Sequence, residues 1–137
     1  MNSLKDKLNQ DARMALQFSY SPYSQKKIGA SLVLTNGKTY SGCNIENASY
    51  GGTVCAERVA IWKAFSENES SEKITEIVVA SDETEPWPPC GFCRQVIAEF
   101  ATPETLIRLV NLEQKEVSYK FKDLFPEAFK PEHLLKK

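Results

Sequence analysis

The chain has 137 residues, a length that suits one domain and allows a hydrophobic core without disulfide support. Its composition, 42% hydrophobic and 26% charged residues, is that of a globular protein and excludes disordered and collagen-like chains. The 17 Lys and Arg residues balance 18 Asp and Glu residues, so the net charge of −1 offers no attraction to a nucleic-acid polymer or an anionic membrane. We therefore expect one domain over residues 1–137, with neither of these two partners.

The N-terminal residues and the cysteine content indicate the compartment. The chain begins Met-Asn-Ser-Leu-Lys-Asp-Lys-Leu, which carries charges where a signal peptide needs an apolar stretch. No apolar run approaches the roughly 20 residues of a membrane span. We therefore expect a cytoplasmic protein, in which the four cysteines are better suited to metal or thiolate chemistry than to disulfides.

The first part of the chain predicts a helix followed by a β-hairpin. Ser3 is suited to cap a helix, and apolar residues recur at three- and four-residue steps over Leu4–Leu16. Asn36-Gly37 is a strong turn signal between two strands, which we expect over Ile28–Thr35 and Lys38–Ile45.

The middle of the chain predicts a buried strand between two helices. A helix is expected from Cys55 to about Ser66. The nearly continuous apolar run Ile74–Ser81 is typical of a central strand that is buried on both faces. A further helix is expected to begin at Cys90 and to end before Pro103.

The last part of the chain predicts two more strands and a helical tail. The strands are expected over Thr105–Val110 and Glu116–Phe121, and the tail over Lys122–Phe129. The five residues between the strands are too few for a parallel crossover, so this pair should be antiparallel. The whole pattern predicts an α/β fold with three layers, α-β-α, around a five-stranded mixed sheet.

Three cysteines are expected at helix starts. Cys90 and Cys93 are three residues apart, so their sulfurs face the same side of one helical turn, and Cys55 opens a different helix. Helix N-termini favour thiolates, which are ligands for Zn²⁺. Three protein ligands with a vacant fourth position are typical of a catalytic zinc site.

The cysteine pattern leaves two alternatives to a zinc enzyme. Cys43 has no partner at two-residue spacing, and we expect it to be a buried, inert residue. If it joined the other three, the protein would be a zinc-stabilised binding module. The second alternative is a thioredoxin-like redox protein built on Cys90-Gly-Phe-Cys93, which leaves Pro89 and Cys55-Ala-Glu57 without a role.

Glu57 is the best candidate for a proton shuttle at such a zinc centre. It stands two residues after Cys55, whereas the single histidine, His133, lies far away in the C-terminal tail. Zn²⁺ with three thiolates carries a net charge of −1, which weakens its power to acidify water. Arg58 and Arg94 closely follow ligand cysteines, so we expect their guanidinium groups to withdraw charge from the sulfurs.

These motifs carry a family resemblance. C-A-E-R at 55–58 and P-C-G-F-C-R-Q-V at 89–96 match the ligand-x-Glu and Pro-Cys-x-x-Cys signature of zinc deaminases, and the sequence resembles the small homotetrameric cytidine deaminases. The resemblance extends through Y-S-P-Y-S at 20–24, I-G-A at 28–30, G-C-N-I-E-N at 42–47 and L-F-P-E-A-F at 124–129. It implies the fold of that family, a Zn²⁺ cofactor, and hydrolytic deamination of cytidine and 2′-deoxycytidine to uridine and 2′-deoxyuridine, with release of ammonia, in pyrimidine salvage.

The resemblance also implies residue roles. Asn44 and Glu46 would hold the ribose, with the carboxylate accepting a hydrogen bond from the 3′-hydroxyl, which suits free nucleosides rather than polynucleotides. The backbone N–H of Ala56 would contact the base. Glu57 would take a proton from a zinc-activated water, pass it to ring nitrogen 3, and later protonate the leaving amino group. Phe129 would reach into a neighbouring subunit's site, in a homotetramer with shared active sites.

One position departs from the family pattern. The family usually has an aromatic residue where this chain has Lys26, and Trp87 and Phe92 are candidates to compensate. The alternative substrate is therefore a modified cytosine nucleoside such as blasticidin S, whose deaminase shares the pair Gly51-Gly52 before the zinc motif. The intact segment 44–47 favours a ribose.

Overall fold

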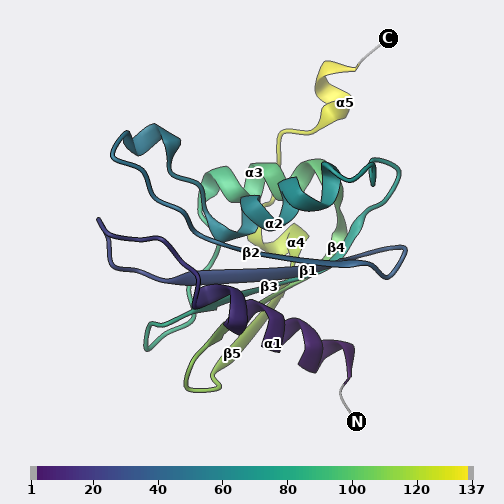
Figure 1. Ribbon diagram of the computed structural model, residues 1–137. Coiled ribbons are helices and arrows are strands. Elements are labelled where there is room, and N and C mark those ends of the chain that lie inside the picture. The colour runs from purple at the N-terminus through teal and green to yellow at the C-terminus, as the bar shows by residue number, and fades with distance from the viewer. Residues whose placement is uncertain (1–2, 136–137) are drawn as a thin grey trace.

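The computed structural model describes residues 3–135 and consists of a five-stranded sheet between two layers of helices (Figure 1). The elements in chain order are α1 (Leu4–Leu16), β1 (Ile28–Leu34), β2 (Thr39–Cys43), the 3₁₀ helix η1 (Tyr50–Gly52), α2 (Ala56–Phe65), β3 (Ile74–Ser81), α3 (Gly91–Phe100), β4 (Ala101–Asn111), β5 (Glu116–Lys120), α4 (Phe121–Leu124) and α5 (Pro131–Leu134). Within residues 3–135, no helix has the length and apolar character needed to cross a membrane.

The strand order is β2-β1-β3-β4-β5, and β3 and β4 are the parallel pair in an otherwise antiparallel sheet. The mixed sheet, the hairpin and the antiparallel final pair predicted from the sequence are confirmed. The expected central strand is also confirmed, because β3 lies in the middle of the sheet and its last five residues are buried.

Each face of the sheet has its own apolar cluster. On one face α1 contributes Leu8, Ala12 and Leu16, which pack with residues of β1, β3 and β4: Val33, Val78, Ala80 and Val110. On the other face a larger cluster joins the sheet to α2, α3 and α4 (Figure 1). Full burial of a side chain such as Leu8 stabilises the fold by about 1.5–3 kcal/mol, so both layers are held mainly by apolar contact.

Two glycines allow the helices to lie directly on the sheet. A Cβ atom at Gly29 of β1 would lie 2.0 Å from the backbone oxygen of Ala12 in α1. A Cβ atom at Gly42 of β2 would lie 2.7 Å from the side chain of Val59 in α2. Gly42 therefore sets the height at which α2, and with it Cys55, stands over the sheet.

The end of α3 differs from the sequence prediction. The helix ends at Phe100, and β4 begins at the next residue rather than at Thr105. Pro103, expected beyond the helix in a loop, lies inside β4 at an irregularity, where the pairing with β3 shifts between Ile74 and Glu76. Proline is tolerated there because no ladder hydrogen bond requires its missing N–H group.

The predicted helical tail over Lys122–Phe129 is wrong for most of its length. The helix α4 ends at Leu124, because Pro126 disfavours a helical conformation at the residue before it. Glu127 then has a φ of 55°, in the left-handed region, which turns the chain. Phe129 lies outside the helices as a result.

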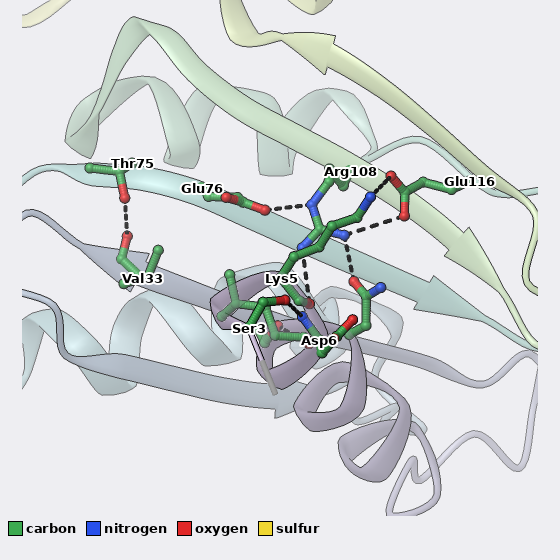
Figure 2. Close-up of polar contacts among 11 residues, drawn as sticks. Ser3, Lys5, Asp6, Val33, Thr75, Glu76, Arg108 and Glu116 are labelled. Atoms are coloured by element: carbon green, nitrogen blue, oxygen red, sulfur yellow. Dashed lines mark hydrogen bonds and ion pairs between the residues drawn. The ribbon is translucent and has the colours of Figure 1, made fainter. Parts of the chain in front are cut away.

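A buried arginine ties α1 to the sheet (Figure 2). Arg108 of β4 is 2% exposed and donates hydrogen bonds to the carboxylates of Glu76 and Glu116. It also donates to Asn9 Oδ1, at 2.5 Å, and to the backbone oxygen of Lys5, at 3.4 Å, both in α1. The guanidinium group thus joins α1, β3, β4 and β5.

We expect Arg108→Met to lower the free energy of unfolding by about 2–3 kcal/mol, because it leaves the partly buried carboxylate of Glu76 without its cation, while Glu116 keeps only its pair with Lys5. Urea denaturation of the metal-saturated protein measures the change. The control is Lys115→Met, which breaks an exposed ion pair with Glu85 and should change the value by less than about 0.5 kcal/mol. Equal effects of the two substitutions would show that the Arg108 network contributes no more than a surface pair.

Candidate active site

Three thiols converge where α2 and α3 begin. Cys55 and Cys90 are the N-cap residues of these helices, and Cys93 lies in the first turn of α3. Their Sγ atoms lie within 4.8 Å of one another, and those of Cys55 and Cys90 are 3.8 Å apart. We call these three residues the thiol cluster. Tetrahedral Zn²⁺, with Zn–S bonds of about 2.3 Å, separates its sulfur ligands by about 3.8 Å, so the thiol cluster fits a zinc ion.

The surroundings of the thiol cluster favour a thiolate at Cys55. A hydrogen bond with the Cys93 thiol and another from the Arg58 guanidinium group, with Nη2 3.4 Å from Sγ, lower the pKa of Cys55 to about 5. The same contact with Cys55, together with burial, raises the pKa of Cys93, so in the metal-free protein this proton stays on Cys93. Metal binding releases it.

No other cysteine or histidine joins the thiol cluster among residues 3–135. Cys43 ends β2 and is partly exposed, so the expected full burial is wrong: β2 is an edge strand and its end is incompletely covered. His133 instead binds the backbone of its own tail, where its Nδ1 accepts a hydrogen bond from the Lys130 N–H at 2.9 Å. Neither residue supports a four-ligand structural zinc site.

Glu57 is the second residue of α2 and is only 4% exposed. Burial raises the pKa of its carboxyl group to about 7. A hydrogen bond from the backbone N–H of Glu57 lowers this pKa, and the negative charge of Cys55 raises it. Within the described part of the chain, no Lys or Arg forms an ion pair with Glu57. The charge of Arg58 lowers this pKa only in part, so the carboxyl group stays poised near neutrality and can both accept and donate a proton.

The two arginines next to the ligand cysteines have different partners. Arg58 makes the expected contact with sulfur, at Cys55. Arg94 does not: its Nε donates to the backbone oxygen of Pro89 at 2.8 Å, and its Nη1 to that of Leu124 at 2.7 Å. Because Pro89 precedes Cys90, Arg94 braces the loop that carries a ligand rather than the ligand itself.

The Asn44 side chain holds the loop that precedes β1. Its Oδ1 accepts hydrogen bonds from Ser19 Oγ and the Ile28 N–H, and its Nδ2 donates to the backbone oxygen of Lys26 at 2.7 Å. Both acceptor positions are therefore occupied, while one of the two Nδ2 hydrogens remains available for a ligand.

Glu46 is similarly tied to the same loop. Its Oε1 accepts from the backbone N–H groups of Tyr23 and Ser24, and its Oε2 accepts from Ser24 Oγ. The Ser24 hydroxyl lowers the pKa of Glu46, so the group is an anion. Sequence analysis missed this role of Ser24, although it lies within the segment Y-S-P-Y-S. A carboxylate offers about four acceptor positions, so one remains for an external hydroxyl.

Lys26 lies beside Trp87, whereas Phe92 lies elsewhere, on Arg58. Lys26 Nζ pairs with Glu83 at 3.1 Å and lies 5.7 Å from the centre of the Trp87 ring. The Phe92 ring instead stacks on Arg58, with 4.1 Å between the guanidinium carbon and the ring centre, a contact that sequence analysis missed. Of the two candidate substitutes for the missing aromatic residue, Trp87 is therefore the one beside Lys26.

Phe129 is 53% exposed. Its backbone oxygen accepts a hydrogen bond from Gln95 Nε2 in α3 at 2.8 Å, and its ring stacks on His133, with the ring centres 5.2 Å apart. The backbone is thus anchored next to α3 while much of the ring remains open to a further contact.

Together, the fold and the site define a class of protein: a three-layer α/β protein with a three-thiolate metal centre and a buried carboxyl group beside it. A family model described as the cytidine and deoxycytidylate deaminase zinc-binding region matches residues 2–109. The chain therefore belongs to the cytidine and deoxycytidylate deaminase family.

Relatives with similar sequences and structures agree with this assignment. The chain is 42% identical over 127 residues to a cytidine deaminase of Halalkalibacterium halodurans, covering 93% of this chain and 95% of the relative. It is 41% identical over 129 residues to a cytidine deaminase of Sporosarcina psychrophila, covering 94% and 93%. The crystal structure of a cytidine deaminase from Burkholderia pseudomallei aligns with a TM-score of 0.86 at 37% identity, covering 93% of this chain and all of the other. The cytidine deaminase of Mycobacterium tuberculosis aligns with a TM-score of 0.77 at 31% identity, covering 93% and 98%.

Proposed function

We propose that this protein is a zinc-dependent cytidine deaminase, which hydrolyses cytidine and 2′-deoxycytidine to the uracil nucleosides and ammonia. The observation that carries the proposal is the buried Glu57, two residues from Cys55 in a cluster whose sulfur spacing suits Zn²⁺. A catalytic zinc centre needs an open position and a proton acceptor, and these residues supply both.

The thiol cluster would hold the zinc ion through the thiolates of Cys55, Cys90 and Cys93. Bound Zn²⁺ supplies Lewis-acid chemistry, which lowers the pKa of a water molecule so that hydroxide forms near neutral pH. Arg58 offsets the negative charge of three thiolates through its contact with Cys55. The pair Cys90 and Cys93 is kept in place by Arg94, which fastens Pro89 to the backbone of α4.

Glu57 would move two protons in one turnover. Its carboxylate first accepts a proton from the attacking water and passes it to ring nitrogen 3 of cytosine, which makes carbon 4 more electrophilic. The hydroxyl that remains of the water adds to carbon 4, and the Glu57 carboxylate then takes the proton of this hydroxyl. It delivers that proton to the amino group, the bond between carbon 4 and nitrogen breaks, and ammonia leaves. A pKa of about 7 suits a group that must act as both base and acid near neutrality. The backbone N–H of Ala56 would donate to the base; Ala56 is the first residue of α2, where backbone N–H groups have no partner within the helix.

The sugar would lie against Asn44 and Glu46. Each has one hydrogen-bonding position left after its contacts with the loop, a donor on Asn44 and an acceptor on Glu46. An anionic acceptor binds a free 3′-hydroxyl and repels a 3′-phosphate, so the substrate is a nucleoside and not a polynucleotide. The net charge of −1 is consistent with the same preference.

We expect Glu46→Gln to lower kcat/KM for cytidine about 10- to 100-fold, because a hydrogen bond to a charged group contributes about 1.5–3 kcal/mol. With 3′-deoxycytidine, which lacks the hydroxyl, the same substitution should change kcat/KM less than about threefold. Steady-state kinetics on both substrates checks this, with Glu113→Gln as a surface control. Equal losses on both substrates would mean that Glu46 only holds the loop.

The assembly and cellular setting belong to the same proposal. Residues 1–137 would form one domain that assembles into a homotetramer in the cytoplasm and acts in pyrimidine salvage. The exposed ring of Phe129 supports a shared site, because it is free to contact the base bound by a neighbouring subunit. Light scattering coupled to size exclusion, with activity measured in each fraction, tests the assembly; a fully active monomer would contradict it.

A direct assay tests the reaction and its alternative. The zinc-loaded protein is supplied with cytidine, 2′-deoxycytidine and blasticidin S, and ammonia release is measured for each. Faster turnover of the two nucleosides supports the proposal. Faster turnover of blasticidin S would instead assign the protein to modified cytosine nucleosides, which is the alternative that Lys26 raises.

A further inference from the structure

An exposed aromatic ring covers the arginine beside the thiol cluster. Phe92 lies between Cys90 and Cys93 in α3 and is 62% exposed, yet its ring centre is 4.1 Å from the guanidinium carbon of Arg58 in α2. Trp62, one turn after Arg58, contacts the same group more distantly, at 5.8 Å. Arg58 itself is only 8% exposed. Its cation therefore lies among aromatic rings from two helices.

Hydrogen bonds alone do not account for the position of Arg58. A guanidinium group has five N–H donors, and the side-chain partners of Arg58 in the described residues are sulfur atoms: Nη2 donates to Cys55 Sγ at 3.4 Å, and Cys93 is a second partner. Its Nε is buried without a partner among residues 3–135, and no described carboxylate pairs with it. A buried cation with so few partners needs another source of stabilisation, and the face of an aromatic ring provides one.

We propose that Phe92 is a positioning residue that holds the Arg58 guanidinium group against Cys55 and thereby strengthens zinc binding by the thiol cluster. Zn²⁺ with three thiolates leaves a net negative charge at a partly buried site, and a cation fixed nearby offsets it. Without the Phe92 ring, the flexible Arg58 side chain can turn toward solvent, and the negative charge of the zinc–thiolate centre then loses the cation that offsets it. This inference shares one premise with the proposed function, namely that the thiol cluster binds zinc.

The test compares Phe92→Leu, which keeps apolar cover but has no π face, with Phe92→Tyr, which keeps the face. Zinc affinity is measured by competition with a chromogenic chelator. We expect Phe92→Leu to raise the zinc Kd about fivefold and Phe92→Tyr to leave it within about twofold of the original value. Trp62→Leu is the control for a more distant ring and should change the Kd by less than about twofold.

Two further readouts separate positioning from general packing. In the Co²⁺-substituted protein, Phe92→Leu should shift the thiolate-to-cobalt charge-transfer band, because the hydrogen bond to Cys55 Sγ is weakened, whereas Phe92→Tyr should not. Arg58→Met should raise the zinc Kd about 10- to 100-fold, and in that background Phe92→Leu should add no further loss.

The inference is overturned if Phe92→Leu leaves both the Kd and the band unchanged, or if its effect persists in full without Arg58. These outcomes are distinguishable from failure of the proposed function. A protein that binds zinc with the expected dependence on Phe92 but does not deaminate cytidine overturns the proposed function alone. A protein that deaminates cytidine with no dependence of zinc binding on Phe92 overturns this inference alone, and a protein that binds no zinc overturns both.

Discussion

We expect Glu57→Gln to lower kcat for cytidine by about 10⁴-fold, the largest effect of any conservative substitution in the chain. Glutamine has nearly the same shape as glutamate but cannot accept a proton, and general acid–base catalysis by one group contributes about 10²–10⁴-fold. Because Glu57 carries out two proton transfers in each turnover, we expect an effect at the upper end of this 10²–10⁴-fold range. The measurement is the loss of cytidine absorbance at saturating substrate.

The design of this experiment excludes indirect causes. Because Glu57 is 4% exposed and burial raises its pKa, replacing it with a neutral amide should not destabilise the fold, and zinc content should stay unchanged. Glu99→Gln, on the exposed side of α3, is the control and should retain full activity. If Glu57→Gln kept more than about a tenth of the activity while holding zinc, the proton shuttle would have to be another group.

The second large effect is expected on zinc content. Cys55→Ala should abolish both stoichiometric zinc and deamination, because two thiolates cannot form the centre. The Cys55 side chain makes no capping hydrogen bond to α2, so its removal should leave the helix start intact. Metal analysis after dialysis measures the loss.

Cys43→Ala is the matched control, because it removes a thiol that lies outside the thiol cluster. It should keep one zinc ion per chain and full activity. Loss of zinc in this variant would revive a four-cysteine binding module. Free reaction of all thiols with a thiol reagent in the zinc-loaded wild-type protein would instead favour a redox protein.

Local patterns predicted much of the fold, and its two exceptions have different causes. The turn at Asn36-Gly37 and the apolar run over β3 are local signals, and both were correctly interpreted. The end of α3 depends on how β4 pairs with β3 around Pro103, which no local signal encodes. The helical tail ends early for a local reason, because Pro126 ends α4 at Leu124; the left-handed turn at Glu127 that follows has no signal in the residue type.

The candidate site was predictable to a similar extent. The spacing of Cys90 and Cys93 places both on one helical turn. Cys55 lies 35 residues before Cys90, and its expected place at a helix start, together with the motif resemblance, is what joins it to the other two in sequence. The partners of Arg94 were not foreseen because one of them, Leu124, lies 30 residues further along the chain. Phe92 was considered for the substrate side, whereas its ring lies on Arg58.

The position of the thiol cluster, between the first turns of α2 and α3, makes the metal a cross-link as well as a reaction centre. Zinc would tie together two helices that share one face of the sheet and that contact each other only sparingly (Figure 1). On the opposite face, α1 is held by its own apolar cluster and by the Arg108 network. Apolar contact holds both layers, but zinc would add a second constraint to the layer of α2 and α3 alone, so loss of zinc would loosen the starts of these two helices and leave the α1 layer unchanged.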